Sequence, residues 1–156
     1  MEELKISTKI QVYDYNELNP AEKKLIDAAK EAVQRAYVPY SHFQVGAAVL
    51  LDNNEVITGN NQENVAFPSG LCAERTALFY ANSHFPDAAV DTIAVAAYAN
   101  GDFTEDPVTP CGACRQVILE AQNRYRHPVR IMLYGKKAVY VIERITDLLP
   151  LAFGSF

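Results

Sequence analysis

The three cysteines of the chain fall in two short clusters. Cys72 stands two residues before Glu74, and Cys111 and Cys114 form a Cys-x-x-Cys pair directly after Pro110. Thiolates suit Zn²⁺, and this spacing lets two sulfurs from one turn reach the same tetrahedral ion. A structural zinc site usually closes with four protein ligands, whereas a catalytic site keeps one position for water. Three cysteines without a fourth therefore predict an open zinc site, with Glu74 as a base beside the open position.

Three other interpretations of the cysteines are open at this point. Cys111 and Cys114 could form a redox pair, but nothing around them resembles a thioredoxin motif, and Cys72 would be left over. The cysteines could also be ordinary buried residues, which would have no reason to keep this spacing. A closed structural zinc site could take its fourth ligand from one of the histidines, namely His42, His84 or His127.

Composition narrows the class of protein. A chain of 156 residues with 49% hydrophobic content suits one soluble globular domain with a sizeable core. No apolar run is long enough to span a membrane, and residues 1–5 lack the apolar stretch of a signal peptide. Thiolates persist best in a reducing compartment, so we expect a cytoplasmic protein that binds no membrane. The net charge of −5 disfavours nucleic acid as a partner, because nucleic-acid binders usually carry a basic face.

The elements that must position the cysteines follow from periodicity. Residues 5–13 alternate between apolar and polar, which predicts a half-buried strand, and Asn19-Pro20 starts an amphipathic helix over 20–37. Further helices are expected from Cys72 to Ala81, from Pro110 or Cys111 to Asn123, and over 146–149. Strands are expected over 43–51, 55–58, 91–98, 129–133 and 138–142, with loops over 61–71 and 99–109.

This order of elements indicates a layered α/β domain with helices on both faces of the sheet. Both cysteine clusters then open helices at the ends of strands. Free backbone N–H groups and the helix dipole favour thiolate over thiol at that position. The fold therefore supports the metal site that the spacing predicts.

The two clusters together read C-x-E…P-C-x-x-C, which matches the Cys₃ variant of the zinc-dependent nucleobase deaminase signature. Over roughly residues 20–154 the sequence resembles a cytidine deaminase of the small homotetrameric type. The resemblance rests on five segments, which are Tyr40–Ala48 (YSHFQVGAA), Asn61–Asn64 (NQEN), Cys72–Ala77 (CAERTA), Pro110–Gln116 (PCGACRQ) and Leu148–Pro150 with Phe153-Gly154.

The resemblance implies a fold and a reaction. The fold is a three-layer α/β/α sandwich with a mixed, roughly five-stranded sheet. Residues 19–156 would form the deaminase domain, and residues 1–18 an N-terminal extension with a strand. The reaction is the hydrolytic deamination of cytidine and 2′-deoxycytidine to uridine and 2′-deoxyuridine with release of ammonia, in pyrimidine salvage. Zinc on the three cysteines would lower the pKa of a bound water, and the hydroxide would attack C4 while Glu74 carries the proton to N3.

The resemblance also implies how the substrate is held. Asn61 and Glu63 match a pair that hydrogen-bonds the sugar 3′-hydroxyl, and backbone atoms of Ala73 would contact the base. Phe43 matches an aromatic that packs on the pyrimidine, with a core position as its alternative. Phe153 matches a residue that enters a neighbouring subunit's pocket, which implies a homotetramer with shared active sites; anchoring of the chain end is its alternative.

Two further positions bear on the site. Three thiolates and one Zn²⁺ sum to a formal charge of −1, which would oppose ionisation of the bound water, and a guanidinium from Arg75 donating to sulfur would offset that charge. A surface ion pair is the alternative role for Arg75. Phe67-Pro68 stands where the family commonly has a tyrosine and a flexible residue, so the lip over the sugar would be stiffer and lack one hydroxyl.

Four rival functions can be weighed on the sequence. Deamination of a nucleoside antibiotic, as in the related blasticidin deaminases, is disfavoured by the Asn61 and Glu63 pair. Editing of nucleic acid is disfavoured by the negative charge. Deoxycytidylate would need phosphate-binding cations, and residues 61–70 contain none. A non-catalytic zinc-stabilised module would not explain Glu74.

Overall fold

A computed structural model describes residues 1–154 of the chain, which form one mixed sheet with three α-helices. The helices are α1 (Pro20–Ala32), α2 (Ala73–His84) and α3 (Gly112–Tyr125). The strands are β1 (Gln11–Tyr13), β2 (Gln44–Leu51), β3 (Val56–Asn60), β4 (Val90–Ala99), β5 (Asp102–Phe103), β6 (Arg130–Tyr134) and β7 (Val139–Ile142). Short 3₁₀ turns are η1 (Tyr15–Glu17), η2 (Val33–Arg35), η3 (Phe67–Ser69) and η4 (Ile145–Asp147).

The strands lie in the order β1-β7-β6-β4-β2-β3, and β5 pairs with β4 beside this path. The β4–β6 pair is parallel, and the other pairs are antiparallel. A parallel pair needs a crossover, and α3 supplies it between β4 and β6. The expected mixed sheet is confirmed, with seven strands instead of about five.

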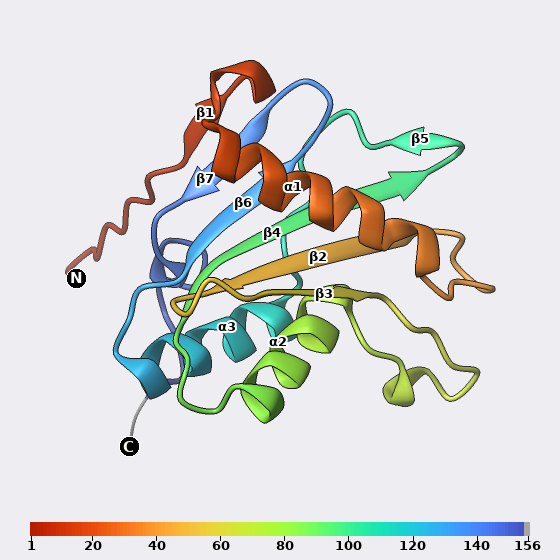
Figure 1. Cartoon of the computed structure of the whole chain (residues 1–156). Helices are drawn as coiled ribbons and strands as arrows, with labels where there is room; N and C mark the ends of the chain where they lie inside the picture. Colours follow the sequence, from red (N-terminus) through yellow and green to blue (C-terminus); the bar gives the residue numbers. More distant parts are fainter. Residues whose placement is uncertain (155–156) are drawn as a thin grey trace.

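The helices cover both faces of the sheet, as the sequence predicts. α1 lies on one face, and α2 and α3 lie side by side on the other (Figure 1). Each face has its own apolar core: one packs under α1 around Ile26 and Met132, and the other packs under α2 and α3 around Leu78 and Ile118. Within the described chain, no helix is long and apolar enough to cross a membrane.

Two glycines set how closely the helices approach β2 and β3. A Cβ on Gly46 would lie 2.1 Å from the carbonyl oxygen of Ala29 on α1. A Cβ on Gly59 would lie 2.5 Å from the backbone nitrogen of Ala77 on α2. No side chain fits either gap, so backbone packs against backbone from opposite faces of the sheet. The contact at Gly59 fixes α2, whose first residue follows Cys72.

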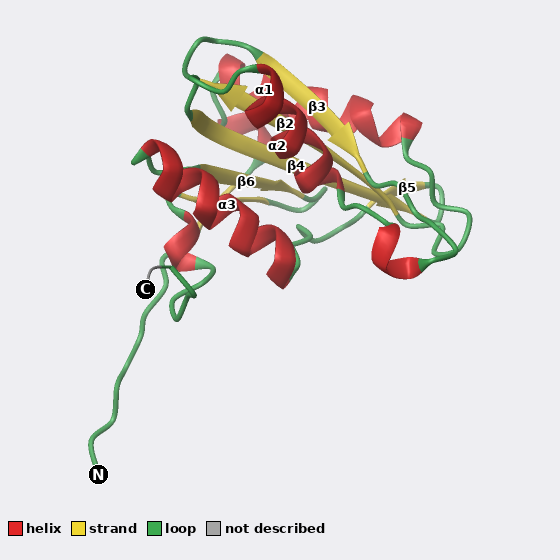
Figure 2. Ribbon diagram, turned by 90° about the horizontal axis from the view of Figure 1, so that it is seen from below, coloured by secondary structure: helices red, strands yellow, loops and turns green. Residues whose placement is uncertain are grey.

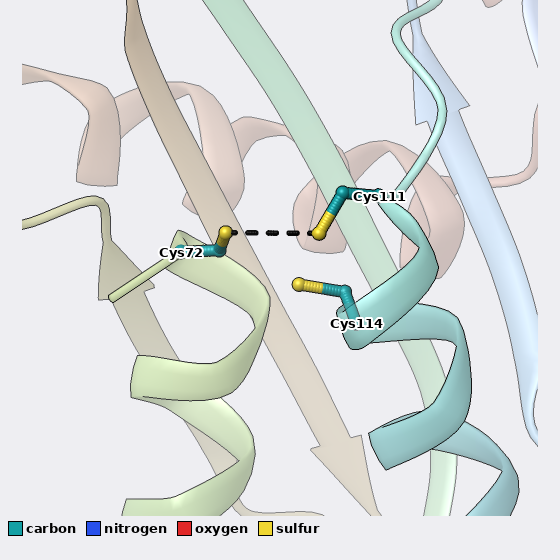
Figure 3. Close-up of side chains that lie close together, drawn as sticks. All are labelled: Cys72, Cys111 and Cys114. Carbon is teal, nitrogen blue, oxygen red and sulfur yellow. Dashed lines mark hydrogen bonds between the residues drawn. The ribbon is translucent and has the colours of Figure 1, made fainter. Parts of the chain in front are cut away.

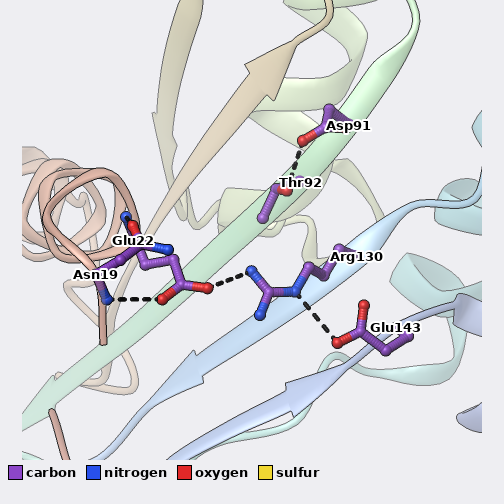
Figure 4. Close-up of polar contacts among 6 residues, drawn as sticks. All are labelled: Asn19, Glu22, Asp91, Thr92, Arg130 and Glu143. Atoms are coloured by element: carbon purple, nitrogen blue, oxygen red, sulfur yellow. Dashed lines mark hydrogen bonds and ion pairs between the residues drawn. The ribbon is translucent and has the colours of Figure 1, made fainter. Parts of the chain in front are cut away.

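α1 begins with the predicted cap and is tied to the sheet through it. The side chain of Asn19 accepts from the backbone nitrogen of Glu22, and the Glu22 carboxylate accepts from the backbone nitrogen of Asn19, which makes a capping box. The same carboxylate accepts from Arg130 Nη1 at 2.6 Å, and Arg130 Nε lies 3.4 Å from Glu143 Oε1 (Figure 4). One carboxylate therefore joins the start of α1 to β6.

The N-terminal extension departs from the predicted strand over 5–13. Only Gln11–Tyr13 pairs, with Val139–Val141 of β7, and β7 itself ends one residue further on at Ile142. Residues 1–10 are exposed, and the start of the chain leads away from the body of the molecule (Figure 2), but the Thr8 hydroxyl still donates to the carbonyl oxygen of Asp147. Tyr15 ties the next turn down: its hydroxyl donates to Asp27, and its ring lies beside Lys30 Nζ, 5.5 Å from the centroid.

A second departure lies between β4 and α3. The predicted loop over 99–109 contains the short strand β5, which turns back on β4. Asn100 and Gly101 both have positive φ, 56° and 87°, as a type I′ turn between antiparallel strands requires. The Asn-Gly pair is the sequence signal that predicts this hairpin. The remaining strands and helices agree with the predicted ones to within a few residues. The helix predicted over 20–37 is shorter: α1 ends at Ala32 and the η2 turn follows it.

Candidate active site

Three sulfur atoms meet where α2 and α3 begin. Cys72 is the N-cap of α2, Cys111 is the N-cap of α3, and Cys114 lies in the first turn of α3. The three Sγ atoms all lie within 4.8 Å of one another, and those of Cys72 and Cys111 are 3.9 Å apart. Figure 3 shows the three side chains pointing toward one another across the gap between the helices.

This arrangement fits a zinc ion. Zn–S bonds of about 2.3 Å in a tetrahedron separate sulfurs by roughly 3.8 Å, close to the Cys72–Cys111 distance. Neither N-cap cysteine makes a side-chain capping bond, so both thiols are available as ligands. Among residues 1–154, the cluster able to hold a metal consists of the three cysteines and includes none of the three histidines. Three protein ligands leave a fourth position open.

The pKa values of two of the cysteine thiols are shifted in opposite directions. Hydrogen bonds from Cys114 and Arg75 lower the pKa of Cys72 to about 5, although burial opposes the shift. Donation to Cys72 and burial raise the pKa of Cys114. Arg75 Nη2 donates to Cys72 Sγ at 3.3 Å, and that bond raises the pKa of the guanidinium further. These contacts favour the thiolate form of Cys72, and Arg75 faces sulfur, as the charge argument predicts.

Glu74 lies in the first turn of α2, beside the sulfurs. It is one of two buried polar residues in the described core, with 5% exposure. Burial raises the pKa of its carboxyl group, and the nearby Cys72 thiolate adds to the shift. A carboxyl group whose pKa is raised toward neutrality can both take and give a proton, which is the property of a general acid–base. Ala73, between Cys72 and Glu74, is fully buried.

A cavity of about 520 Å³ opens beside the sulfurs. Its lining includes Cys72 and Arg75 and also the predicted sugar ligands Asn61 and Glu63. The other lining residues come from the loops on either side of the cavity and are Tyr40, Ser41, Gln62, Asn64, Phe67, Gly70 and Leu71. The structure therefore brings one of the metal ligands, Cys72, and both candidate sugar ligands to one cavity.

Asn61 and Glu63 also hold the loop before β2. Asn61 Oδ1 accepts from the backbone nitrogen of Val45, and Nδ2 donates to the carbonyl oxygen of Phe43, both at 2.8 Å. Glu63 Oε2 accepts from the backbone nitrogens of Tyr40 and Ser41 at 2.9 and 3.2 Å. The hydrogen bond from the Ser41 hydroxyl is the largest of several that lower the pKa of Glu63. Both side chains are thus fixed in place by backbone atoms.

Phe43 and Phe153 are not among the residues that line the cavity in this single chain. Phe43 is half-buried and reaches the site through its backbone contact with Asn61. Phe153 is 74% exposed, and its carbonyl oxygen accepts from Gln116 Nε2 at 2.8 Å. Phe67 forms an edge-to-face pair with Tyr40 at the cavity wall, with centroids 6.0 Å apart. Sequence reasoning did not identify Tyr40 as a lining residue, although it begins the YSHFQVGAA segment.

Comparison with known proteins bears on what this site does. The family described as the cytidine and deoxycytidylate deaminase zinc-binding region matches residues 20–127. A cytidine deaminase from Halalkalibacterium halodurans is 45% identical over 131 residues, 83% of this chain and 91% of its own length. One from Sporosarcina psychrophila is 44% identical, over 85% and 90%. A crystal structure of the cytidine deaminase from Burkholderia pseudomallei, 40% identical, covers 83% of this chain and 97% of its own with a TM-score of 0.71.

Proposed function

Because the chain belongs to the zinc-dependent cytidine deaminase family, we propose that it hydrolyses both cytidine and 2′-deoxycytidine, giving uridine or 2′-deoxyuridine and ammonia. The observation that carries this proposal is the meeting of three cysteine sulfurs beside a buried glutamate and a cavity of nucleoside size. The reaction serves pyrimidine salvage. Three thiol ligands need a reducing compartment, so the enzyme works in the cytoplasm.

The cysteines hold the metal, and Glu74 moves the proton. Zn²⁺, when bound by Cys72, Cys111 and Cys114, supplies a Lewis acid that makes a water nucleophilic near neutral pH. Glu74 takes a proton from the attacking water and delivers it to N3 of the ring, and it later helps ammonia to leave from C4. Arg75 donates to Cys72 Sγ and withdraws negative charge from the thiolates.

The remaining residues bind the nucleoside. Asn61 and Glu63 hydrogen-bond the sugar 3′-hydroxyl, which cytidine and 2′-deoxycytidine share, so both are substrates. Backbone atoms of Ala73 contact the base, and the ring of Phe43 packs against it. Each of these four residues lies on a segment that adjoins Cys72 or the cavity wall.

The charges around the cavity favour a nucleoside over a nucleotide. Arg75 is the one cationic side chain among the lining residues, and it donates to Cys72 Sγ. Glu63 lines the same cavity and adds a negative charge to it. A 5′-phosphate would therefore meet repulsion without a compensating cation. Deoxycytidylate and nucleic acid are disfavoured on the same ground.

We further propose a homotetramer in which Phe153 of each subunit closes a neighbour's cavity. Phe153 is exposed, and Phe79 and Tyr80 on α2 are about half exposed. Packing between copies would cover these rings. Residues 19–156 form the deaminase domain in this proposal, and residues 1–18 are an extension that adds one strand to the sheet.

Substrate conversion tests the proposed function directly. Purified protein is incubated with cytidine, 2′-deoxycytidine, deoxycytidylate and a cytosine-nucleoside antibiotic, and ammonia and the uracil product are quantified. We expect turnover of the two nucleosides and little of the other two compounds. Turnover of deoxycytidylate above that of the nucleosides would contradict the charge argument. No turnover of any compound by zinc-loaded protein would support the non-catalytic alternative, and sedimentation reports the assembly independently.

A further inference from the structure

The two residues that follow Cys114, Arg115 and Gln116, make contacts that the proposed mechanism does not use. The Arg115 guanidinium donates from Nε to the carbonyl oxygen of Pro110 at 2.8 Å, and from Nη2 to Thr109 Oγ1 at 3.3 Å. Pro110 and Thr109 directly precede the ligand Cys111. One side chain of α3 thus reaches back to the loop that delivers a metal ligand to the start of the same helix.

The same guanidinium also holds the C-terminal segment. Arg115 Nη1 donates to the carbonyl oxygen of Leu148 at 2.8 Å, and Gln116 Nε2 donates to the carbonyl oxygen of Phe153 at 2.8 Å. Leu148 is buried and Phe153 is exposed. Neighbouring side chains therefore fasten the two ends of residues 148–153. A terminal segment is ordered only where it is tied down in this way.

The other end of the loop is fixed by the turn between β6 and β7. The backbone nitrogens of Lys136 and Lys137 donate to the carbonyl oxygens of Thr104 and Glu105, each at 3.0 Å. This turn holds the start of the loop, and Arg115 holds its end at Thr109 and Pro110. The hydrogen bond from Arg115 to Pro110 thus holds the residue that directly precedes Cys111.

We propose that Arg115 is a positioning residue that keeps Cys111 and Cys114 in metal-binding geometry and joins the metal loop to the C-terminal segment, with Gln116 holding the end of that segment. Arginine suits the task because its planar fork presents several donors at fixed angles, which one lysine ammonium cannot reproduce. Without it, carbonyl groups of the buried residues Pro110 and Leu148 would lose their partner. The inference rests on the cysteine site and does not depend on which substrate is used.

Zinc release in the absence of substrate tests the positioning role. Zinc-loaded wild-type, Arg115→Met, Arg115→Lys and Arg124→Met proteins are mixed with a chromophoric chelator, and the release rate is followed. Arg124 is a matched control, because it lies on the same helix and donates to the carbonyl oxygen of Pro86, away from the site. We expect release about 10–100-fold faster for Arg115→Met, an intermediate rate for Arg115→Lys, and the wild-type rate for Arg124→Met.

A purely structural role for Arg115 gives a different result. It would lower the thermal unfolding midpoints of the zinc-free and zinc-loaded proteins by equal amounts and leave the release rate unchanged. Release from both Arg115 variants within about twofold of wild type would overturn the proposal. If Arg115→Met does not fold, the test uses Arg115→Lys. The positioning role requires that zinc raise the unfolding midpoint of Arg115→Lys by less than it raises the unfolding midpoint of wild type.

Limited proteolysis tests the hold on the C-terminal segment. Chymotrypsin cuts after Leu151 and Phe153, and mass spectrometry follows the trimming. We expect faster trimming in Arg115→Met and Gln116→Leu than in wild type or Arg124→Met, with zinc release unchanged in Gln116→Leu. Equal trimming in all four proteins would overturn the part of the proposal that concerns the C-terminal segment, independently of any deaminase assay.

Discussion

Asn61 and Val45 are joined by a 2.8 Å hydrogen bond from the backbone nitrogen of Val45 to Asn61 Oδ1, and Asn61 Nδ2 donates to the carbonyl oxygen of Phe43 at the same distance. The amide thus replaces a pair of sheet hydrogen bonds just beyond the end of β3. A residue proposed to bind the sugar is also part of the framework that holds Phe43. Loss of the Asn61 side chain therefore affects both the stability of the fold and the binding of substrate, and the two effects can be measured separately.

Asn61→Ala is expected to lower both stability and substrate affinity. Two partly buried backbone groups lose their partner, which costs about 1–3 kcal/mol in the free energy of unfolding. KM for cytidine rises because Phe43 shifts and the sugar contact is lost. Denaturant titration and steady-state kinetics measure the two effects. Asn53→Ala is the control, because Asn53 caps the β2–β3 turn away from the cavity and its loss leaves KM unchanged. A raised KM without a loss of stability would show that the backbone contacts of Asn61 are dispensable.

Glu74→Gln is expected to retain zinc and lose activity. Removal of general acid–base catalysis lowers kcat by about 10²–10⁴-fold, and Glu74 serves several proton transfers, so the loss reaches at least that range. Zinc content by elemental analysis and kcat for cytidine check the two halves of the prediction. A variant with near-wild-type kcat would remove Glu74 from the mechanism.

The same variant is expected to stabilise the zinc-free protein at neutral pH. Burial raises the pKa of Glu74, so the folded state binds the proton more tightly than the unfolded state. The stability that Glu74 contributes is complete below its unfolded pKa of about 4.3 and is lost as pH rises through the raised value. Wild type therefore loses stability over that interval and Glu74→Gln does not. Parallel stability curves for the two proteins above pH 5 would contradict this sign.

Glu22→Gln is expected to show the opposite pH dependence. Partial burial raises the pKa of Glu22, but hydrogen bonds from Arg130 and from the backbone of Asn19 outweigh that effect and hold the pKa below its ordinary value. Glutamine keeps the capping box and loses the charge opposite Arg130, at a cost of about 1 kcal/mol at pH 7. This difference from wild type closes as pH falls below about 4, through the lowered pKa. Glu31→Gln, at an exposed position of the same helix, is the control.

Gly135→Ala is expected to disturb the loop that leads to Cys111. A Cβ at Gly135 would lie 2.5 Å from the backbone nitrogen of Pro107, so the loop must move. Overpacking of this kind costs about 1–3 kcal/mol, and zinc release accelerates because the loop ends at Cys111. Gly112→Ala serves as a stability control, because a Cβ there meets nothing within 4 Å. Equal unfolding midpoints for the two alanine variants would contradict the expected clash.

The metal site could be predicted from the sequence because its signal is local. Cys72 lies two residues before Glu74, and Cys111 lies three residues before Cys114. The contacts of Asn61 with Phe43 and Val45 depend instead on the register of β2 on β3, where Gly46 faces Asn60. Spacing along one chain cannot fix that register.

The N-terminal strand shows the same limit from the other side. Alternation over 5–13 predicts one strand, but only Gln11–Tyr13 forms it, and its partner β7 lies far along the chain, where the local pattern carries no information about it. β5 could have been predicted, because Asn100-Gly101 is a short-range turn signal. It was missed because the composition around that pair is polar and suggests a loop. Arg115 contacts Thr109 and Pro110, which precede α3 in the sequence, and Leu148, which follows it. A sequence motif alone does not reveal such contacts.

Subunit mixing tests the proposed sharing of active sites through Phe153. In a shared site, the cavity with its Glu74 belongs to one subunit and the closing Phe153 to a neighbour. Glu74→Gln and Phe153→Ala homotetramers are each expected to be nearly inactive, the first for lack of a proton carrier and the second for lack of the closing ring. A hybrid contains cavities in which an intact Glu74 meets an intact Phe153 from the other parent.

With random exchange at equal amounts, about one quarter of the cavities combine both intact residues, so activity recovers to about a quarter of wild type. Mass spectrometry under native conditions verifies that hybrids have formed. Confirmed hybrids without recovered activity would exclude sharing through Phe153, because the two lesions would then lie in the same cavity. A Phe153→Ala homotetramer as active as wild type would remove the ring from the site. A monomer by sedimentation would exclude the assembly on which the argument depends.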